Sequence, residues 1–165
     1  MKSRYVMPLK RRRLKKTDYK KRLGLIKGGL PRAVIRKSIK NMRVDIAEYA
    51  VSGDKIIAHG CTVELKKYGW KSPTGNTPSS YLAGYLAGLR AKKKGIKKVN
   101  ADLGRQKVIK GSKLMASIQG LIDSGVKVPV SKKFLPHNDR ITGKHLKTVE
   151  ENSVETVKKA MEESL

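Results

Sequence analysis

The sequence is poor in cysteine, in aromatic residues and in long apolar runs. Its one cysteine, Cys61, forms no disulfide within the chain, and three scattered histidines add no spacing typical of a zinc site. No stretch approaches the roughly 18 apolar residues of a membrane span, and the first residues lack the apolar run of a signal peptide. These absences predict a soluble, intracellular protein with no metal, no cofactor and no membrane partner.

Acidic residues are also few. Thirteen Asp and Glu stand against 39 Lys and Arg, and the formal net charge is +26. Self-repulsion of this size opposes compaction unless a polyanion neutralises it. The net charge is +15 over residues 1–40, +1 over 41–89, +13 over 90–147 and −3 over 148–165. This layout predicts a folded body with a near-neutral part and two basic regions, both of which bind a polyanion.

Motifs for catalysis are missing as well. The chain has no phosphate-binding G-x-x-x-x-G-K-[ST] loop, and no Ser/His/Asp or Cys/His arrangement can be singled out. Asp45 and Asp102 fall on expected strands, and carboxylates on neighbouring strands can hold Mg²⁺ for phosphodiester cleavage. However, Asp45 has an ordinary partner in Arg43, and the nearby acids form no tight cluster. We therefore expect no enzymatic activity.

The chain divides into three parts. Residues 1–16, MKSRYVMPLKRRRLKK, have no apolar period, so we expect an arm that folds only on its partner. Residues 17–147 contain strands followed by a helix–strand–helix alternation, which predicts an α/β domain with a mixed sheet. Residues 148–165 are acidic and are expected to be helical.

Strand periods occupy the first half of the domain. AVIRKS (33–38), MRVDIAEYA (42–50) and KIIAHGC (55–61) predict strands, the last two joined as a hairpin. Before them, we expect a short helix that Thr17 caps and that places Leu23 on its apolar face. This order puts the strands next to a basic helix.

Helix signals dominate the second half. TPSSYLAGYLAGLRAKKKG (77–95) is expected to begin with Thr77 as its cap and to end at its last glycine. A second helix is expected to begin after Ser112 and to end at Gly125, whereas LPHNDRITG (135–143) is expected to be a loop.

The 77–95 helix has two features that need a reason. Gly84 and Gly88 each cost the helix about 1 kcal/mol relative to Ala, so close packing on the sheet or close approach to an RNA backbone is expected there. Its end carries more positive charge than the helix dipole explains, which favours phosphate contact. The cations concerned are Arg90, Lys92, Lys93 and Lys94.

Several aromatic residues lie among basic ones. Tyr5, Tyr19, Tyr68 and Trp70 have this context, and aromatic platforms among cations are typical of proteins that bind unpaired bases. Burial in the core is the alternative for part of this set. Tyr85 lies in an apolar stripe and is expected to be buried.

Several long motifs resemble one known family. YKKRLGLIKGGLPRAVIRKS, ELKKYGWK and GNTPSSYLAGYLAGLRAKKKGI are similar to the archaeal large-subunit ribosomal protein eighteen family, whose eukaryotic counterpart is large-subunit protein five. The resemblance continues through KGSKLMASIQGLIDSGVKVP and LPHNDRITGKH and covers about residues 10 to 146. At Asp45 the family more often has glutamine; because an acid repels phosphate, we leave Asp45 out of the RNA contacts.

The resemblance implies a fold and a role. The fold is a three-layer α/β/α domain with a mixed sheet, and the role is structural, in the large subunit of the cytoplasmic ribosome. The family binds 5S ribosomal RNA (5S rRNA) and anchors it to the large-subunit rRNA in the central protuberance. Implied partners are these two RNAs and neighbouring subunit proteins, including the other 5S-associated protein.

Residues and resemblance together predict an RNA-binding surface. The arm would lie along phosphates and gain affinity by releasing counterions, and the first helix and strand would extend that surface. The loop over residues 68–76 would lie where bases are unstacked. The expected RNA-binding residues are Lys10, Arg11, Arg12, Arg13, Lys15, Lys16, Tyr19, Lys20, Lys21, Arg22, Arg32, Arg36, Lys37, Trp70, Lys71, Asn76, Arg90, Lys92, Lys93 and Lys94.

Two alternatives stay open at this point. A basic protein of this charge is also expected to compact nucleic acids without selectivity. The acidic end, whose Val154, Val157 and Met161 share one side, either packs on the domain or docks on a neighbouring basic ribosomal protein.

Overall fold

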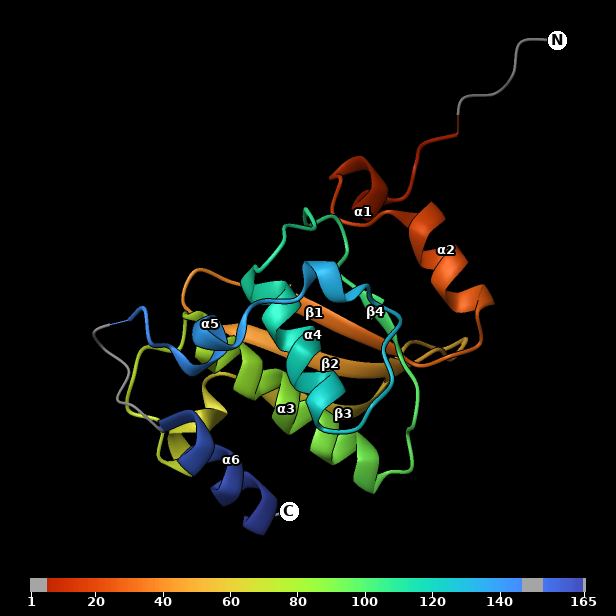
Figure 1. The fold of residues 1–165 in the computed structure, drawn as a ribbon. Helices are drawn as coiled ribbons and strands as arrows, with labels where there is room; N and C mark the ends of the chain where they lie inside the picture. The colour runs from red at the N-terminus through yellow and green to blue at the C-terminus, as the bar shows by residue number, and fades with distance from the viewer. Residues whose placement is uncertain (1–5, 147–152, 165) are drawn as a thin grey trace, which may run out of the picture.

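A four-stranded mixed sheet is the centre of the computed structural model, which describes residues 6–146 and 153–164 (Figure 1). The strand order is β3-β2-β1-β4. The first three strands are antiparallel and β4 runs parallel to β1. The strands are β1 (Arg32–Lys37), β2 (Met42–Glu48), β3 (Lys55–Cys61) and β4 (Asn100–Asp102).

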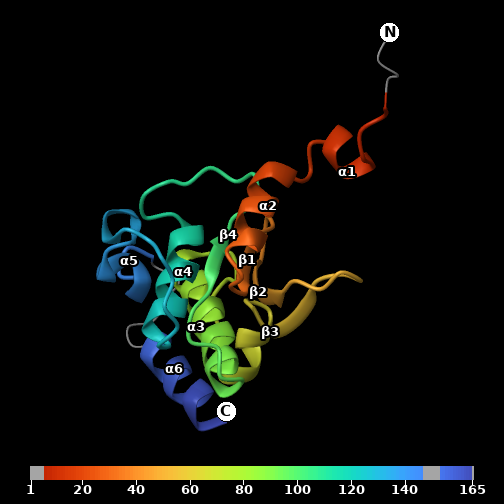
Figure 2. The ribbon, with the colours of Figure 1, turned by 90° about the vertical axis from the view of Figure 1, so that its right-hand side faces the viewer.

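Helices lie on both sides of this sheet, as expected for an α/β fold of this kind (Figure 2). The α-helices are α1 (Lys10–Arg13), α2 (Tyr19–Lys27), α3 (Thr77–Lys93), α4 (Lys113–Asp123), α5 (Asn138–Thr142) and α6 (Ser153–Ser164). Two 3₁₀-helices, η1 (Glu64–Tyr68) and η2 (Lys132–Phe134), complete the described elements.

One face of the sheet forms the main core with α3 and α4. Ala33 and Ile35 of β1 and Val44 and Ile46 of β2 are fully buried, because alternate residues of a strand point to the same face. Apolar side chains of α4, such as Ile118, cover them. The opposite face of β1 therefore carries its polar residues.

Glycines bring α3 and α4 into close contact. A Cβ atom at Gly84 would lie 2.0 Å from the Ser117 carbonyl oxygen of α4, and one at Gly88 would lie 1.9 Å from Ser124 Oγ. Across the same seam, a Cβ at Gly120 would lie 2.1 Å from the Tyr81 carbonyl oxygen. The expectation that Gly84 and Gly88 face the sheet or an RNA backbone is wrong, since their partner is α4.

A second buried cluster joins α3 to the C-terminal helix. Val154, Val157 and Met161 of α6 are at most 4 % exposed and pack with Tyr81 and Tyr85. The Tyr85 hydroxyl donates a hydrogen bond to Glu162. Burial, followed by that carboxylate, raises the pKa of Tyr85 to about 12, so the hydroxyl stays a donor. Of the two interpretations of the acidic end, the described part supports packing on the domain; residues 147–152 lie outside the described residues.

Helices α1 and α2 lie on the other side of the sheet from α4 (Figure 2). Neither helix has a buried residue, and Leu23 of α2 is 54 % exposed. The apolar face expected to carry Leu23 is therefore not buried at that residue. Of the partly covered side chains of α2, Arg22 contacts a carboxylate of the body, as described below.

Several local expectations hold and others shift by one residue. Ser112 is the N-cap residue of α4, and Gly125 ends the connection after it with a φ of 100°. The cap of α2 is Asp18 rather than Thr17, and the cap of α3 is Asn76 rather than Thr77. The expected loop at 135–143 contains α5, a single short helix whose Ile141 is buried.

Candidate nucleic-acid interface

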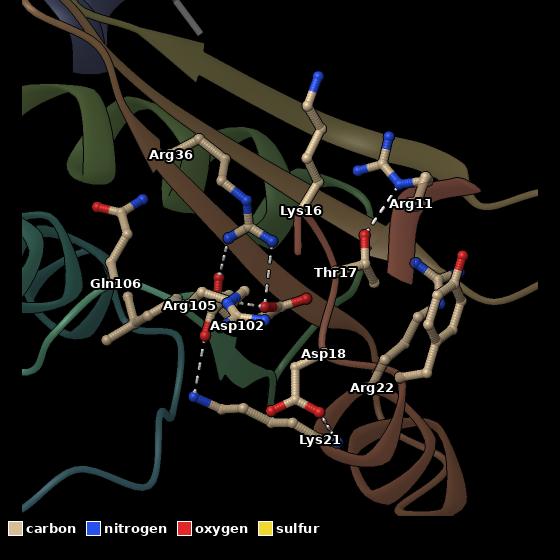
Figure 3. Close-up of a pocket in the computed structure, with 13 residues that line it drawn as sticks. Arg11, Lys16, Thr17, Asp18, Lys21, Arg22, Arg36, Asp102, Arg105 and Gln106 are labelled. Carbon is tan, nitrogen blue, oxygen red and sulfur yellow. Dashed lines mark hydrogen bonds and ion pairs between the residues drawn. The ribbon is translucent and has the colours of Figure 1, made fainter. Parts of the chain in front are cut away.

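A groove of about 550 Å³ lies where α1 and α2 meet the polar face of β1 and the end of β4 (Figure 3). Residues from the arm, from α2, from both strands and from the segment after β4 line it. Its basic residues are Arg11, Lys16, Lys21, Arg22, Arg36 and Arg105. Six cations around one hollow surface suit a phosphate-rich ligand.

The two acids in this groove are already used by the protein. Asp18 Oδ1 caps α2 by accepting the Lys21 backbone N–H at 3.1 Å. Asp102 accepts from the Gly104 backbone N–H at 2.8 Å and lies 3.2 Å from both the Arg32 and the Arg36 guanidinium. The cations of the groove therefore outnumber the carboxylate charge that the protein itself supplies.

Arg32 and Arg36 lie on the same face of β1 but differ in environment. Arg32 is 2 % exposed and forms ion pairs with Asp54 at 2.7 Å and Asp102 at 3.2 Å. The Arg36 side chain is 41 % exposed, and its Nη1 donates to the carbonyl oxygens of Ile35 and Asp102 at 2.8 and 2.7 Å. Arg36 is held in place and open to a ligand, whereas Arg32 is a structural residue.

Asp54 connects α2 to the sheet. Its carboxylate lies 2.9 Å from Arg22 of α2 and 2.7 Å from Arg32 of β1. Burial raises the pKa of Asp54, but the two guanidinium groups outweigh burial and bring that pKa below its ordinary value of 3.8. The carboxylate is thus ionised at neutral pH and holds both arginines.

The basic arm forms one helical turn beside the groove. All four residues of α1 are basic and exposed, and Arg11 Nε donates to Thr17 Oγ1 at 2.9 Å. The expectation that the arm folds only on its partner stays a prediction; within its described residues 6–16, Lys10–Arg13 form this turn. No residue of α1 is buried, so its cations face solvent.

The basic end of α3 is a separate group, located at the opposite end of the domain from α1 (Figure 1). Arg90 is tied to Glu64 at 2.8 Å and donates to the His59 carbonyl oxygen at 2.7 Å. The Lys94 ammonium group contacts the Ile57 carbonyl oxygen. Lys92 and Lys93 are exposed and are the cations of this group that face solvent.

The loop after η1 does not present its tryptophan. Trp70 is 3 % exposed in the second core cluster, and its Nε1 donates to the Pro73 carbonyl oxygen at 3.4 Å. The expectation that the Trp70 ring stacks on bases is wrong for this buried ring. Asn76 Oδ1 caps α3 by accepting the Ser79 N–H at 2.8 Å, whereas Lys71 is exposed.

The twenty expected residues therefore fall into three environments. Arg32 and Trp70 are buried. Tyr19, Arg22, Arg36, Asn76 and Arg90 are partly covered. The exposed residues are Lys10, Arg11, Arg12, Arg13, Lys15, Lys16, Lys20, Lys21, Lys37, Lys71, Lys92, Lys93 and Lys94.

One basic segment that borders the groove was missing from the expected residues. Arg105 lines the groove, and the segment after it carries Lys107 and Lys110, both exposed. The charge of +13 over residues 90–147 was the available signal. Without a periodic element to place them, these cations gave no sign of which side they face.

The carboxylates considered for a metal do not converge. Asp45 and Asp102 lie on strands that β1 separates, with Val34 paired to both. Asp45 is bound to Arg43 at 2.8 Å and to His59 at 2.5 Å. Among residues 6–146 and 153–164, no three His, Cys, Asp or Glu side chains form a group able to hold a metal.

Within the same described ranges, none of the helices combines the length and the apolar character that crossing a membrane requires.

Comparison with known proteins gives one consistent family. A family model described as "Ribosomal large subunit proteins 60S L5, and 50S L18" matches residues 3–101. These residues include the arm, α2 and α3. Large ribosomal subunit protein uL18 of Korarchaeum cryptofilum is 43 % identical over 157 residues, which are 92 % of this chain and 80 % of that protein.

Two further relatives carry the same name. The protein of Thermofilum pendens is 44 % identical over 144 residues (87 % of this chain, 74 % of that protein), and the protein of Haloarcula marismortui is 41 % identical over 148 residues (90 % and 79 %). The chain belongs to the family of large-subunit ribosomal proteins that comprises 60S L5 and 50S L18.

Proposed function

We propose that this large-subunit ribosomal protein binds 5S rRNA through the arm, α2 and the groove. It thereby helps to anchor 5S rRNA to the large-subunit rRNA in the central protuberance of the cytoplasmic ribosome. The family supports a structural role in the large subunit, and the sequence motifs that resemble the 5S-binding family support the choice of RNA. The role needs no catalytic group.

The observation that carries the proposal is the balance of charge in the groove. Its six cations surround two acids that cap α2 or hold Arg32 and Arg36 in place. Arg36 is positioned by two backbone carbonyls, which prepares its guanidinium for bidentate phosphate contact. The adjoining exposed turn α1 adds four cations that gain affinity by counterion release.

The second basic group extends the proposal to a second RNA segment. Lys92 and Lys93 lie at the other end of the domain from α1, so they form a basic group separate from the groove (Figure 1). We assign the groove to 5S rRNA and the end of α3 to large-subunit rRNA. Neighbouring proteins, including the other 5S-associated protein, are further partners of this proposal.

Non-selective compaction of nucleic acids is the competing function. The observation that favours it is the net charge of +26, which attracts any polyanion. Non-specific binding has dissociation constants of about 10⁻⁴–10⁻⁶ M at physiological salt. A selective complex is therefore distinguishable by competition.

The test is competition of labelled 5S rRNA against unlabelled 5S rRNA, transfer RNA and duplex DNA at near-physiological salt. We expect only 5S rRNA to displace the label efficiently. The double variant Arg11→Ala/Lys16→Ala should weaken the complex, whereas Lys66→Ala/Lys67→Ala, with the same loss of charge on η1 outside the groove, should change it little. Equal competition by transfer RNA or DNA, or equal effects of the two double variants, contradicts the proposal.

A further inference from the structure

An exposed phenylalanine lies beside a further set of cations. Among the described aromatic residues, Trp70, Tyr81 and Tyr85 are buried, whereas Phe134 is 43 % exposed and Tyr49 is 51 % exposed. Phe134 ends η2 directly after Lys132 and Lys133, both exposed. Tyr49 instead follows Glu48. Phe134 thus has the context of an exposed aromatic ring among cations that the sequence suggested for Trp70.

The segment 105–112 lies next to η2. The Gly111 backbone N–H donates to the Phe134 carbonyl oxygen at 3.0 Å, which ties the segment to η2. Val108 and Ile109 are 50 % and 59 % exposed in the same segment. Figure 1 shows the segment running from β4 to the start of α4, above the sheet and towards α1.

The surface made by segment 105–112 and η2 has no acid of its own. The sequence contains no Asp or Glu between Asp102 and Asp123, or between Asp123 and Asp139. The two pieces supply Arg105, Lys107, Lys110, Lys132 and Lys133. An acidic ligand therefore meets no carboxylate of these two pieces. The exposed apolar side chains between the cations can also make apolar contacts with it.

The position of the Phe134 backbone is set by the fold. The Phe134 N–H donates to the Ser131 carbonyl oxygen at 3.1 Å, and the following Leu135 packs against the main core. Backbone bonds on both sides and a core contact one residue away fix η2. Because this backbone is already ordered, little backbone entropy is lost when a ligand binds there.

We propose that segment 105–112 and η2 form a further contact surface, which binds an unpaired stretch of RNA with a base stacked on Phe134. Bases within a duplex are stacked on their neighbours, whereas the base of a single strand can turn onto an aromatic ring. The cations bind the flanking phosphates. Apolar contact with Val108 and Ile109 covers the rest of the nucleotide.

This surface shares Arg105 with the groove but differs from it in chemistry. The groove presents guanidinium and ammonium groups for phosphates, whereas the Phe134 surface adds a ring and two aliphatic side chains for bases. The inference rests on the proposed function only in that the ligand is RNA. It does not require that the RNA be 5S rRNA.

The test uses the fact that the chain has one phenylalanine. Full-length protein labelled with 4-fluorophenylalanine gives a ¹⁹F signal from Phe134 alone. We expect this resonance to move, with saturation, when a single-stranded RNA of about eight nucleotides is added. An abasic strand of the same length carries the same phosphates and should leave the resonance in place, and a blunt duplex should have little effect.

Affinity measurements on variants give a second readout. Phe134→Leu keeps an apolar side chain but removes the ring, and should weaken binding of the single strand roughly fivefold or more, as the loss of one base stack requires. Phe134→Trp should retain the affinity. Tyr49→Leu removes the other aromatic ring that is exposed among the described residues, and it is the matched control, with no change expected.

Three results overturn the inference. One is a resonance that stays in place while fluorescence anisotropy shows the strand bound; another is an equal shift with the abasic strand. The third is a shift seen only with other proteins of the large subunit, which assigns the surface to a protein. Selectivity for 5S rRNA is measured separately by the competition with transfer RNA, so either proposal can fail while the other holds.

Discussion

The two terminal regions of the chain, residues 6–27 and helix α6, attach to the domain in opposite ways. The first is basic, has no buried residue in either helix, and contacts the body through polar bonds such as that of Arg22 to Asp54. The second buries Val154, Val157 and Met161 against α3 and has acids on its exposed side. Apolar burial holds α6 to the domain, whereas charge holds residues 6–27.

This difference separates residues that maintain the fold from residues available to a ligand. A helix that buries nothing contributes little to stability, and its surface is free for another molecule. Helix α3 combines both roles in one element, since residues 77–88 are buried while Lys92 and Lys93 at its end are exposed. Perturbing each region separately tests the distinction.

Removal of the C-terminal helix should give the largest effect. Truncation after Lys147 exposes the surface that three apolar side chains of α6 cover, and each such side chain contributes about 1.5–3 kcal/mol. We expect the free energy of unfolding, measured in urea, to fall by about 5 kcal/mol.

Should the truncated chain fail to fold, Met161→Ala is the milder change, with an expected loss of about 3 kcal/mol. Leu23→Ala, at an exposed position of α2, is its control and should cost less than about 0.5 kcal/mol. Unchanged stability after truncation contradicts the packing role and favours docking of α6 on a neighbouring protein.

Matched glycine substitutions compare a packed helix with an unpacked one. A Cβ at Gly84 of α3 meets the Ser117 backbone at 2.0 Å, so Gly84→Ala should lower the free energy of unfolding by about 3 kcal/mol. A Cβ at Gly24 of α2 meets nothing within 4 Å, so Gly24→Ala should stabilise the helix by up to about 1 kcal/mol. Equal unfolding midpoints for the two variants would remove the contrast between the helices.

Deletion of residues 1–16 should act on binding and leave the fold intact. The deleted segment carries eight of the 39 basic residues. The slope of log K for 5S rRNA against log salt should become shallower by about 0.7 to 0.9 for each phosphate that the arm no longer neutralises. A thermal unfolding transition like that of the full chain is expected. An unchanged slope would show that the arm lies away from the RNA.

Acid should weaken the link between the terminal region and the sheet at Asp54. The folded-state pKa of Asp54 is lowered, so its carboxylate stabilises the fold above the ordinary value of 3.8 and loses this contribution as the pH falls through the folded-state pKa. We expect Asp54→Asn to be less stable than the natural chain at pH 7. The two unfolding free energies should converge at pH values where Asp54 is protonated. A constant difference across that range excludes Asp54 as the cause.

The sequence predicted the fold where the signal is local. Strand alternation located the hairpin of β2 and β3, and Gly95 and Gly125 marked the ends of two helices through their positive φ angles. Long motifs identified the family. The order of the strands in the sheet depends on contacts between distant segments. It was therefore not predictable from the spacing of apolar residues along the sequence.

Site residues were harder to predict because charge does not tell which way a side chain faces. Arg32 and Arg36 are four residues apart on one strand. The Arg32 side chain is buried and ion-paired with two carboxylates, whereas the Arg36 side chain donates to two backbone carbonyls and stays partly exposed. Arg90 has the same local sequence context as its lysine neighbours. Its guanidinium group is nevertheless engaged, in an ion pair with Glu64 and a hydrogen bond to the His59 carbonyl oxygen. These partners come from distant segments, which local patterns do not show.

The end of α3 has a further consequence for the chain before it reaches a ribosome. Strand β3 is an edge of the sheet, and an exposed edge offers its backbone to a strand of another molecule. The carbonyl oxygens of Ile57 and His59 on that edge accept from Lys94 and Arg90. Two long cationic side chains thus cap the edge and discourage sheet extension and aggregation, while like charge keeps free copies apart.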